Sequence, residues 1–109
     1  MIKIKQANYI TCDDVTELIG VSWCECEFAN MAENDSYQIL CCDDAYLEEL
    51  YEDFEDCKWE LEEYEDELPN NPYLRRNIYA NRVRNQIKLV ETLRKTYGIR
   101  DSILVWVSW

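Results

Sequence analysis

Apolar residues recur every three or four positions along two long stretches in the second half of the chain. In residues 43–67 and just beyond, they are Leu47, Leu50, Tyr51, Phe54, Cys57, Leu61, Tyr64 and Leu68. In residues 73–97 they are Leu74, Ile78, Tyr79, Val83, Ile87, Val90, Leu93 and Tyr97. This spacing predicts two amphipathic helices. Asp43 is the expected N-cap of the first, Asn71 followed by Pro72 starts the second, and Gly98 ends it.

The two predicted helices are separated only by the breaker sequence Pro69-Asn70-Asn71-Pro72. A reflection of the residue numbers about the Asn70/Asn71 midpoint places Tyr51 opposite Val90 and Leu61 opposite Ala80. The apolar stripes then meet in antiparallel register. We therefore expect a long antiparallel helical hairpin.

The remaining segments predict a small sheet. Alternating or β-prone residues indicate strands at 2–10, 21–28 and 37–42, with the turn-rich residues 29–36 joining the last two as a hairpin. Residues 103–107 are apolar on both faces, which favours a central strand. Thr11 and Asp14 form a capping box for a short helix over 12–19, which Gly20 ends. The order β-α-β-β-α-α-β predicts an α+β fold, with a mostly antiparallel sheet packed on the helical hairpin.

Composition limits the functions that this chain can have. A length of 109 residues, 48% of them hydrophobic, predicts one domain over residues 1–109. The chain has no His and two Gly, so imidazole-based catalysis and glycine-rich phosphate loops are excluded. Residues 1–6 lack the apolar run of a signal peptide and no stretch is long enough to span a bilayer. We expect a cytoplasmic protein that does not act at a membrane.

Cysteines and paired carboxylates are the other candidates for chemistry. The four residues Cys24, Cys26, Cys41 and Cys42 would lie on adjoining strands, so a zinc site is conceivable. Their spacing is unlike that of the usual zinc motifs, and buried cysteines acting as small hydrophobic residues are the simpler reading. The pairs Asp13-Asp14 and Asp43-Asp44 stand where helices begin, which the helix dipole explains without catalysis. We expect no metal, no cofactor and no enzymatic activity.

The net charge of −12 is divided very unequally along the chain. Residues 43–67 hold fourteen acids and one Lys, a net charge of −13, whereas residues 68–100 hold eight basic residues and one Glu, a net charge of +7. A 25-residue helix is about 37 Å long, so the first predicted helix carries one charge per roughly 2.9 Å. One strand of B-DNA carries one charge per about 3.4 Å. The charge disfavours direct binding to nucleic acid and favours a basic partner.

Trp59 stands out because its helical neighbours at three and four residues are all acids. An aromatic ring among carboxylates is typical of an interface anchor that stacks on a partner's Arg or ring. Packing beneath the sheet or in a dimer interface is the alternative. The predicted partner-binding face is formed by Glu52, Glu55, Asp56, Trp59, Glu62, Glu63 and Asp66.

The acidic segment 43–67 with its embedded Trp59 resembles the small phage- and plasmid-encoded inhibitors that mimic DNA, namely anti-CRISPR and anti-restriction proteins. The resemblance covers about a quarter of the chain and no motif residue is transferred from it. It implies an inhibitor that occupies the nucleic-acid channel of a host nuclease. The Arg-rich stretch 73–97 departs from the more uniformly acidic members, so an inhibitor with one acidic face fits better than a mimic of a whole duplex.

Other functions fit the same sequence. An immunity protein or antitoxin for a basic toxin nuclease would use the same acidic face. A homo-oligomeric structural module, such as a homodimer, could pair acidic with basic helices between chains. A metal-dependent enzyme would use some of the abundant carboxylates.

Overall fold

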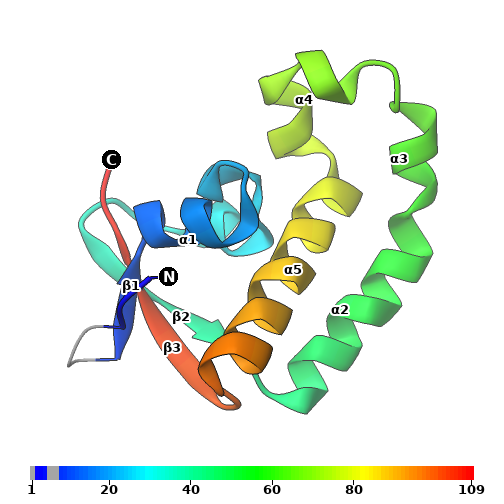
Figure 1. Cartoon of the computed structure of the whole chain (residues 1–109). Coiled ribbons are helices and arrows are strands. Elements are labelled where there is room, and N and C mark those ends of the chain that lie inside the picture. Colours follow the sequence, from blue (N-terminus) through cyan, green and yellow to red (C-terminus); the bar gives the residue numbers. More distant parts are fainter. Residues whose placement is uncertain (1, 5–7) are drawn as a thin grey trace.

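The described residues form a three-stranded mixed sheet and five α-helices, joined in part by short 3₁₀ helices, which confirms the α+β class (Figure 1). The computed structural model describes residues 2–4 and 8–109. The strands are β1 (Tyr9–Thr11), β2 (Ser36–Cys41) and β3 (Ser102–Val107), in the order β1-β3-β2. β3 pairs in parallel with β1 and antiparallel with β2. The predicted central position of the last strand is therefore confirmed.

The predicted strand over residues 2–10 is wrong in its extent. Residues 2–4 are not in a strand, residues 5–7 lie outside the described residues, and β1 covers only Tyr9–Thr11. Ile2 is nevertheless buried, and its backbone N–H donates to the Tyr97 hydroxyl at 3.1 Å. Burial of Ile2 and its hydrogen bond to Tyr97 therefore take the place of the strand pairing that was predicted there.

Helix α1 (Cys12–Ile19) follows its local sequence signals closely. The Asp14 backbone N–H donates to the Thr11 hydroxyl at 3.2 Å, and the Thr11 backbone N–H donates to the Asp14 carboxylate at 2.9 Å. Gly20 takes the left-handed conformation with φ of 76° and donates its N–H to the Thr16 carbonyl. The predicted capping box and the predicted C-terminal glycine are both confirmed.

Residues 21–28 do not form the predicted strand, and they do not form a hairpin with β2. They fold into the 3₁₀ helices η1 (Trp23–Glu25) and η2 (Glu27–Met31). The reason lies in α5, whose side chains bond this backbone: Asn85 donates to the Glu25 carbonyl at 2.9 Å, and Gln86 accepts from the Phe28 N–H at 3.1 Å. Side chains therefore satisfy groups that a strand would pair with a neighbouring strand.

The two long predicted helices are each interrupted. The first divides into α2 (Asp44–Cys57) and α3 (Trp59–Glu63), joined by one tight turn at Lys58, and the helix ends before Glu67. After η3 (Leu68–Asn70), the second divides into α4 (Pro72–Asn77) and α5 (Tyr79–Tyr97). The predicted caps at Asp43, Asn71 and Gly98 are confirmed.

The break between α4 and α5 falls at Ile78, whose backbone is extended and whose side chain is buried. Side chains from the first turn of α5 bond the carbonyls that the break frees. Asn81 donates to the Arg75 carbonyl at 2.8 Å, and Arg82 donates to the carbonyls of Arg76 and Asn77 at 3.3 and 3.1 Å. The break is thus stabilised by polar side chains and by burial of Ile78, without Gly or Pro.

The hairpin has the predicted antiparallel arrangement, with α2 and α3 on the side of α5 away from the sheet (Figure 1). Tyr51 donates to Glu91 at 2.6 Å, close to its predicted partner Val90. The Ala80 N–H, in the first turn of α5, donates to the Glu60 carboxylate at 3.1 Å, next to the predicted pairing with Leu61. α5 therefore lies between the sheet with α1 and the α2–α3 arm.

Two hydrophobic clusters hold these layers together. The larger lies between the sheet, α1, η2 and α5, with Ile10, Val15, Leu40, Leu89 and Val105 among its buried members. The smaller closes the tip of the hairpin with Cys57, Leu68, Ile78 and Ala80. In the part of the chain that the structure describes, no helix has both the length and the apolar composition needed to cross a membrane.

Candidate functional site

The seven residues of the predicted binding face lie along α2, α3 and the turn that follows, and we call them the acidic surface. They are Glu52, Glu55, Asp56, Trp59, Glu62, Glu63 and Asp66. All seven are exposed to solvent. Asp66 lies beyond the end of α3, so it joins this surface through the turn at residues 64–67 and not through the predicted continuous helix.

The carboxylates of the acidic surface have little internal compensation. Glu55 accepts from Lys58 at 2.7 Å, a hydrogen bond that raises the pKa of Lys58. Among the described residues, Glu52, Asp56, Glu62, Glu63 and Asp66 have no side-chain hydrogen bond or ion pair. Solvent screens an ion pair as exposed as Glu55–Lys58, so this pair does little to offset the repulsion among the carboxylates. The surface keeps most of its negative charge available to a partner.

The basic side chains of α4 and α5 mostly bond elsewhere than to the acidic arm. Arg75 pairs with the buried Glu25 at 3.2 Å, and Arg82 pairs with Glu27 at 3.4 Å. The two glutamates belong to the η1–η2 segment. Lys88 donates to the Ile19 carbonyl at 2.8 Å. Of the ion pairs within the described residues, only that of Arg94 with Asp44 joins α5 to α2. The basic stretch therefore stabilises the N-terminal half of the fold and leaves the acidic surface unneutralised.

Trp59 is 60% exposed in the midst of the acidic surface. The alternative that it packs beneath the sheet is wrong, because the sheet lies on the opposite side of α5 (Figure 1). A large exposed ring surrounded by acids has apolar area to lose on binding and can stack on a cation. Its position is consistent with an interface anchor.

The spacing of negative charge along α2 and α3 is close to the spacing predicted for one continuous helix. From Asp44 to Glu63, α2 and α3 contain ten acids and one Lys. Twenty helical residues rise about 30 Å, so the spacing is roughly 3.3 Å per net charge. One strand of B-DNA has about 3.4 Å per charge. The interruption at Lys58 therefore leaves the similarity in charge density intact.

The cysteines are placed differently from the conceivable zinc cluster. Cys24 and Cys26 lie in and beside η1 and not on a strand, and all six cysteines are free thiols. Within residues 2–4 and 8–109, no group of three or more His, Cys, Asp or Glu is arranged to hold a metal ion. Burial raises the pKa of Cys12 and of Cys42 to about 11, and also raises the pKa of Cys26. These buried thiols stay protonated at neutral pH, which makes them weak nucleophiles.

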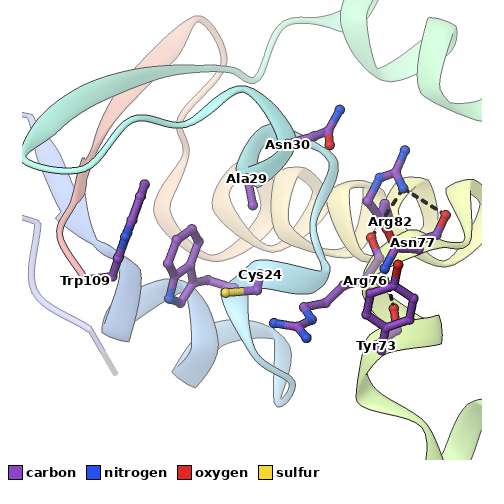
Figure 2. Close-up of a pocket in the computed structure, with 9 residues that line it drawn as sticks. Cys24, Ala29, Asn30, Tyr73, Arg76, Asn77, Arg82 and Trp109 are labelled. Carbon is purple, nitrogen blue, oxygen red and sulfur yellow. Dashed lines mark hydrogen bonds between the residues drawn. The ribbon is translucent and has the colours of Figure 1, made fainter.

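The described residues also form a pocket that sequence reasoning missed, and we call it the Trp–Arg pocket. It has a volume of about 550 Å³ and is lined by residues of η1, η2, α4 and α5 and by Trp109, which follows β3 (Figure 2). The lining residues include Trp23, Cys24, Tyr73, Arg76, Arg82 and Trp109. No spacing pattern in the sequence links these residues. Their only local signals are the Arg75-Arg76 pair and the unusually large number of Trp residues.

Comparisons with protein-family models, with curated proteins and with solved structures found no match for this chain. The function is therefore inferred from the acidic surface itself.

Proposed function

We propose that this protein is a non-catalytic inhibitor that binds the basic nucleic-acid-binding surface of a nuclease, such as a CRISPR or restriction effector. The acidic surface makes the contact, acting in the cytoplasm in place of a phosphate backbone. The observation that carries the proposal is that five of its six carboxylates have no partner among the described residues, while the basic side chains of α4 and α5 bond elsewhere. An immunity protein against a toxin nuclease would use the same contact.

Charge complementarity would act mainly on the rate of association. A negative face steers a basic partner into place, and its effect falls as salt screens the charges. Trp59 would then add a desolvated ring contact near the centre of the interface. Pairing of acidic with basic helices between two copies has less support, since Arg75, Arg82 and Arg94 already pair within the chain.

The experiment reverses the charge of four residues together: Glu55→Lys, Asp56→Lys, Glu62→Lys and Glu63→Lys. The matched control makes the same change at four exposed acids outside α2 and α3: Glu17, Glu33, Asp35 and Asp101. Wild type, variant and control serve as bait for basic nucleic-acid-binding proteins, and each captured nuclease is then purified and assayed for DNA binding and cleavage.

We expect wild type and control to inhibit a captured nuclease, with inhibition weakening as salt rises. The acidic-surface variant should lose inhibition by at least about a hundredfold, since several charge pairs are lost at once. Its circular dichroism spectrum should stay unchanged. A variant that inhibits as well as wild type would refute the proposal, as would a captured nuclease that wild type does not inhibit.

A further inference from the structure

The Trp–Arg pocket has the size of a small-molecule site and lies away from the acidic surface. Its 550 Å³ falls within the roughly 300–1,000 Å³ usual for ligand pockets. Trp23 and Cys24 come from η1, Tyr73 and Arg76 from α4, and Trp109 from the end of the chain (Figure 2). The tertiary structure thus brings together three aromatic side chains and a cation from segments up to 86 residues apart in sequence.

One wall of the pocket is a column of stacked aromatic rings. Trp23 stacks with Phe28 and with Trp109, with ring centroids 6.2 Å apart in each pair and interplanar angles of 26° and 28°. The backbone N–H of Trp109 donates to the Asn34 side chain at 2.8 Å, which holds the residue in place. Trp109 is nevertheless 69% exposed, so part of its ring is open to solvent. A further planar ring could add to this column, as bases stack on aromatic side chains in nucleotide-binding proteins.

The pocket also presents an available cation. Arg76 is exposed, and among the described residues its guanidinium makes no hydrogen bond or ion pair. In Figure 2 its side chain extends from α4 toward Cys24. Arg82, by contrast, is occupied by Glu27 and by the carbonyls of Arg76 and Asn77. None of the nine lining residues is acidic, so the local charge favours an anion despite the net charge of −12.

We propose that the Trp–Arg pocket binds a planar aromatic anion of the class of a nucleoside monophosphate. The base packs against the exposed indole of Trp109 and the edge of Trp23, and the phosphate is bound by Arg76, whose guanidinium matches phosphate geometry with two parallel N–H donors. Tyr73, which is 68% exposed, lines the pocket beside Arg76 and offers a further ring to the ligand. This site does not depend on the proposed inhibitory function, because it shares no residue with the acidic surface.

The test uses the four tryptophans as reporters in ¹⁵N nuclear magnetic resonance spectra of the whole protein. Trp23 and Trp109 line the pocket, whereas Trp59 lies on the acidic surface and Trp106 on β3. Adenosine monophosphate, adenosine and inorganic phosphate are titrated separately at constant ionic strength. We expect adenosine monophosphate to shift the indole signals of Trp23 and Trp109 in a saturable way and to leave those of Trp59 and Trp106 in place.

Adenosine and phosphate should each bind at least about tenfold more weakly than adenosine monophosphate, since each lacks one half of the contacts. Arg76→Gln should weaken binding of adenosine monophosphate about tenfold and leave binding of adenosine unchanged. Lys95→Gln, which removes one exposed charge at the far end of α5, should bind like wild type. Trp109→Ala should weaken both adenosine ligands.

Four results would overturn the inference. They are no saturable shift with adenosine monophosphate, equal shifts at all four indoles, equal affinity for adenosine monophosphate and phosphate, and an Arg76→Gln variant with wild-type affinity. Each can be read from the same titrations, because the spectrum of each variant also reports whether it is folded.

Discussion

The two arms of the helical hairpin have similar apolar spacing and opposite roles. α5 has eight buried residues, on several sides of the helix, whereas α2 has two and α3 has none. α5 is covered by the sheet and α1 on one side and by the α2–α3 arm on the other (Figure 1). An apolar stripe therefore shows that a helix packs on something, but it does not show how many sides are covered.

The polar residues of the two arms differ in the same way. In α5, Asn81, Asn85 and Gln86 are buried and bonded to the η1–η2 segment or to the end of α4. In α2 and α3, most acids lie on the solvent side. A buried polar group must be paired, whereas an exposed charge only repels its neighbours by tenths of a kcal/mol. The outer arm can thus carry charge that the central helix could not.

The largest expected effect comes from making the same truncation in both arms. Leu89 in α5 is fully buried, whereas Leu61 in α3 is half-buried at the smaller cluster. Leu89→Ala should lower the free energy of unfolding by about 2–5 kcal/mol, and Leu61→Ala should lower it by roughly half as much or less. Equilibrium unfolding in urea measures both. Equal losses would mean that the two arms are equally integrated into the core.

A smaller effect is expected from the buried amide of Gln86. Gln86→Leu replaces the amide with an apolar side chain of similar size and removes the acceptor of the Phe28 N–H. The N–H stays buried without its partner, which should cost about 1–3 kcal/mol of stability. Asn77→Ala serves as the control, since the Asn77 side chain bonds the Tyr73 carbonyl on an exposed surface. If Gln86→Leu is as stable as wild type, the side chains of α5 do not determine the conformation of residues 23–31.

The smallest effect tests the cost of the clustered acids. Glu52 in α2 has like charges four residues away on both sides, at Glu48 and Asp56. Glu52→Gln removes both repulsions and should raise the free energy of unfolding by about 0.5–1 kcal/mol at low salt. The gain should shrink in 1 M salt, where the screening length is about 3 Å. A loss of stability, or a gain that salt does not change, would contradict this account of the acidic arm.

Helix boundaries were the most predictable part of the fold. Thr11 with Asp14, Asp43, Asn71 with Pro72, and Gly98 all act as their local signals indicate. Each cap depends on a hydrogen bond between groups a few residues apart or on the backbone freedom of one glycine. The acidic surface was predictable for a similar reason, because acids on the polar side of an amphipathic helix face solvent.

The segment 21–28 shows where such reasoning fails. Its alternation of apolar and polar residues resembles a strand, yet Glu25 is buried and bonded to Arg75 and Asn81, about 50 residues further along the chain. A carboxylate that has partners can be buried, so polarity alone does not show which side chains of this segment face solvent. Burial of Glu25 and Cys26 next to each other is likewise incompatible with a half-exposed strand.

By itself, the sequence determined the helix starts at Thr11, Asp43 and Asn71, the helix ends at Gly20 and Gly98, which strand is central, and that negative charge gathers on one arm. These properties depend on hydrogen bonds within a turn or on composition along a single element. Only the tertiary structure decided that α5 is buried on two sides, that its amides shape residues 23–31, that its basic side chains turn away from the acidic arm, and that a Trp–Arg pocket exists. The physical reason is that these features join groups 20 or more residues apart in sequence, and whether such groups meet depends on how the layers pack.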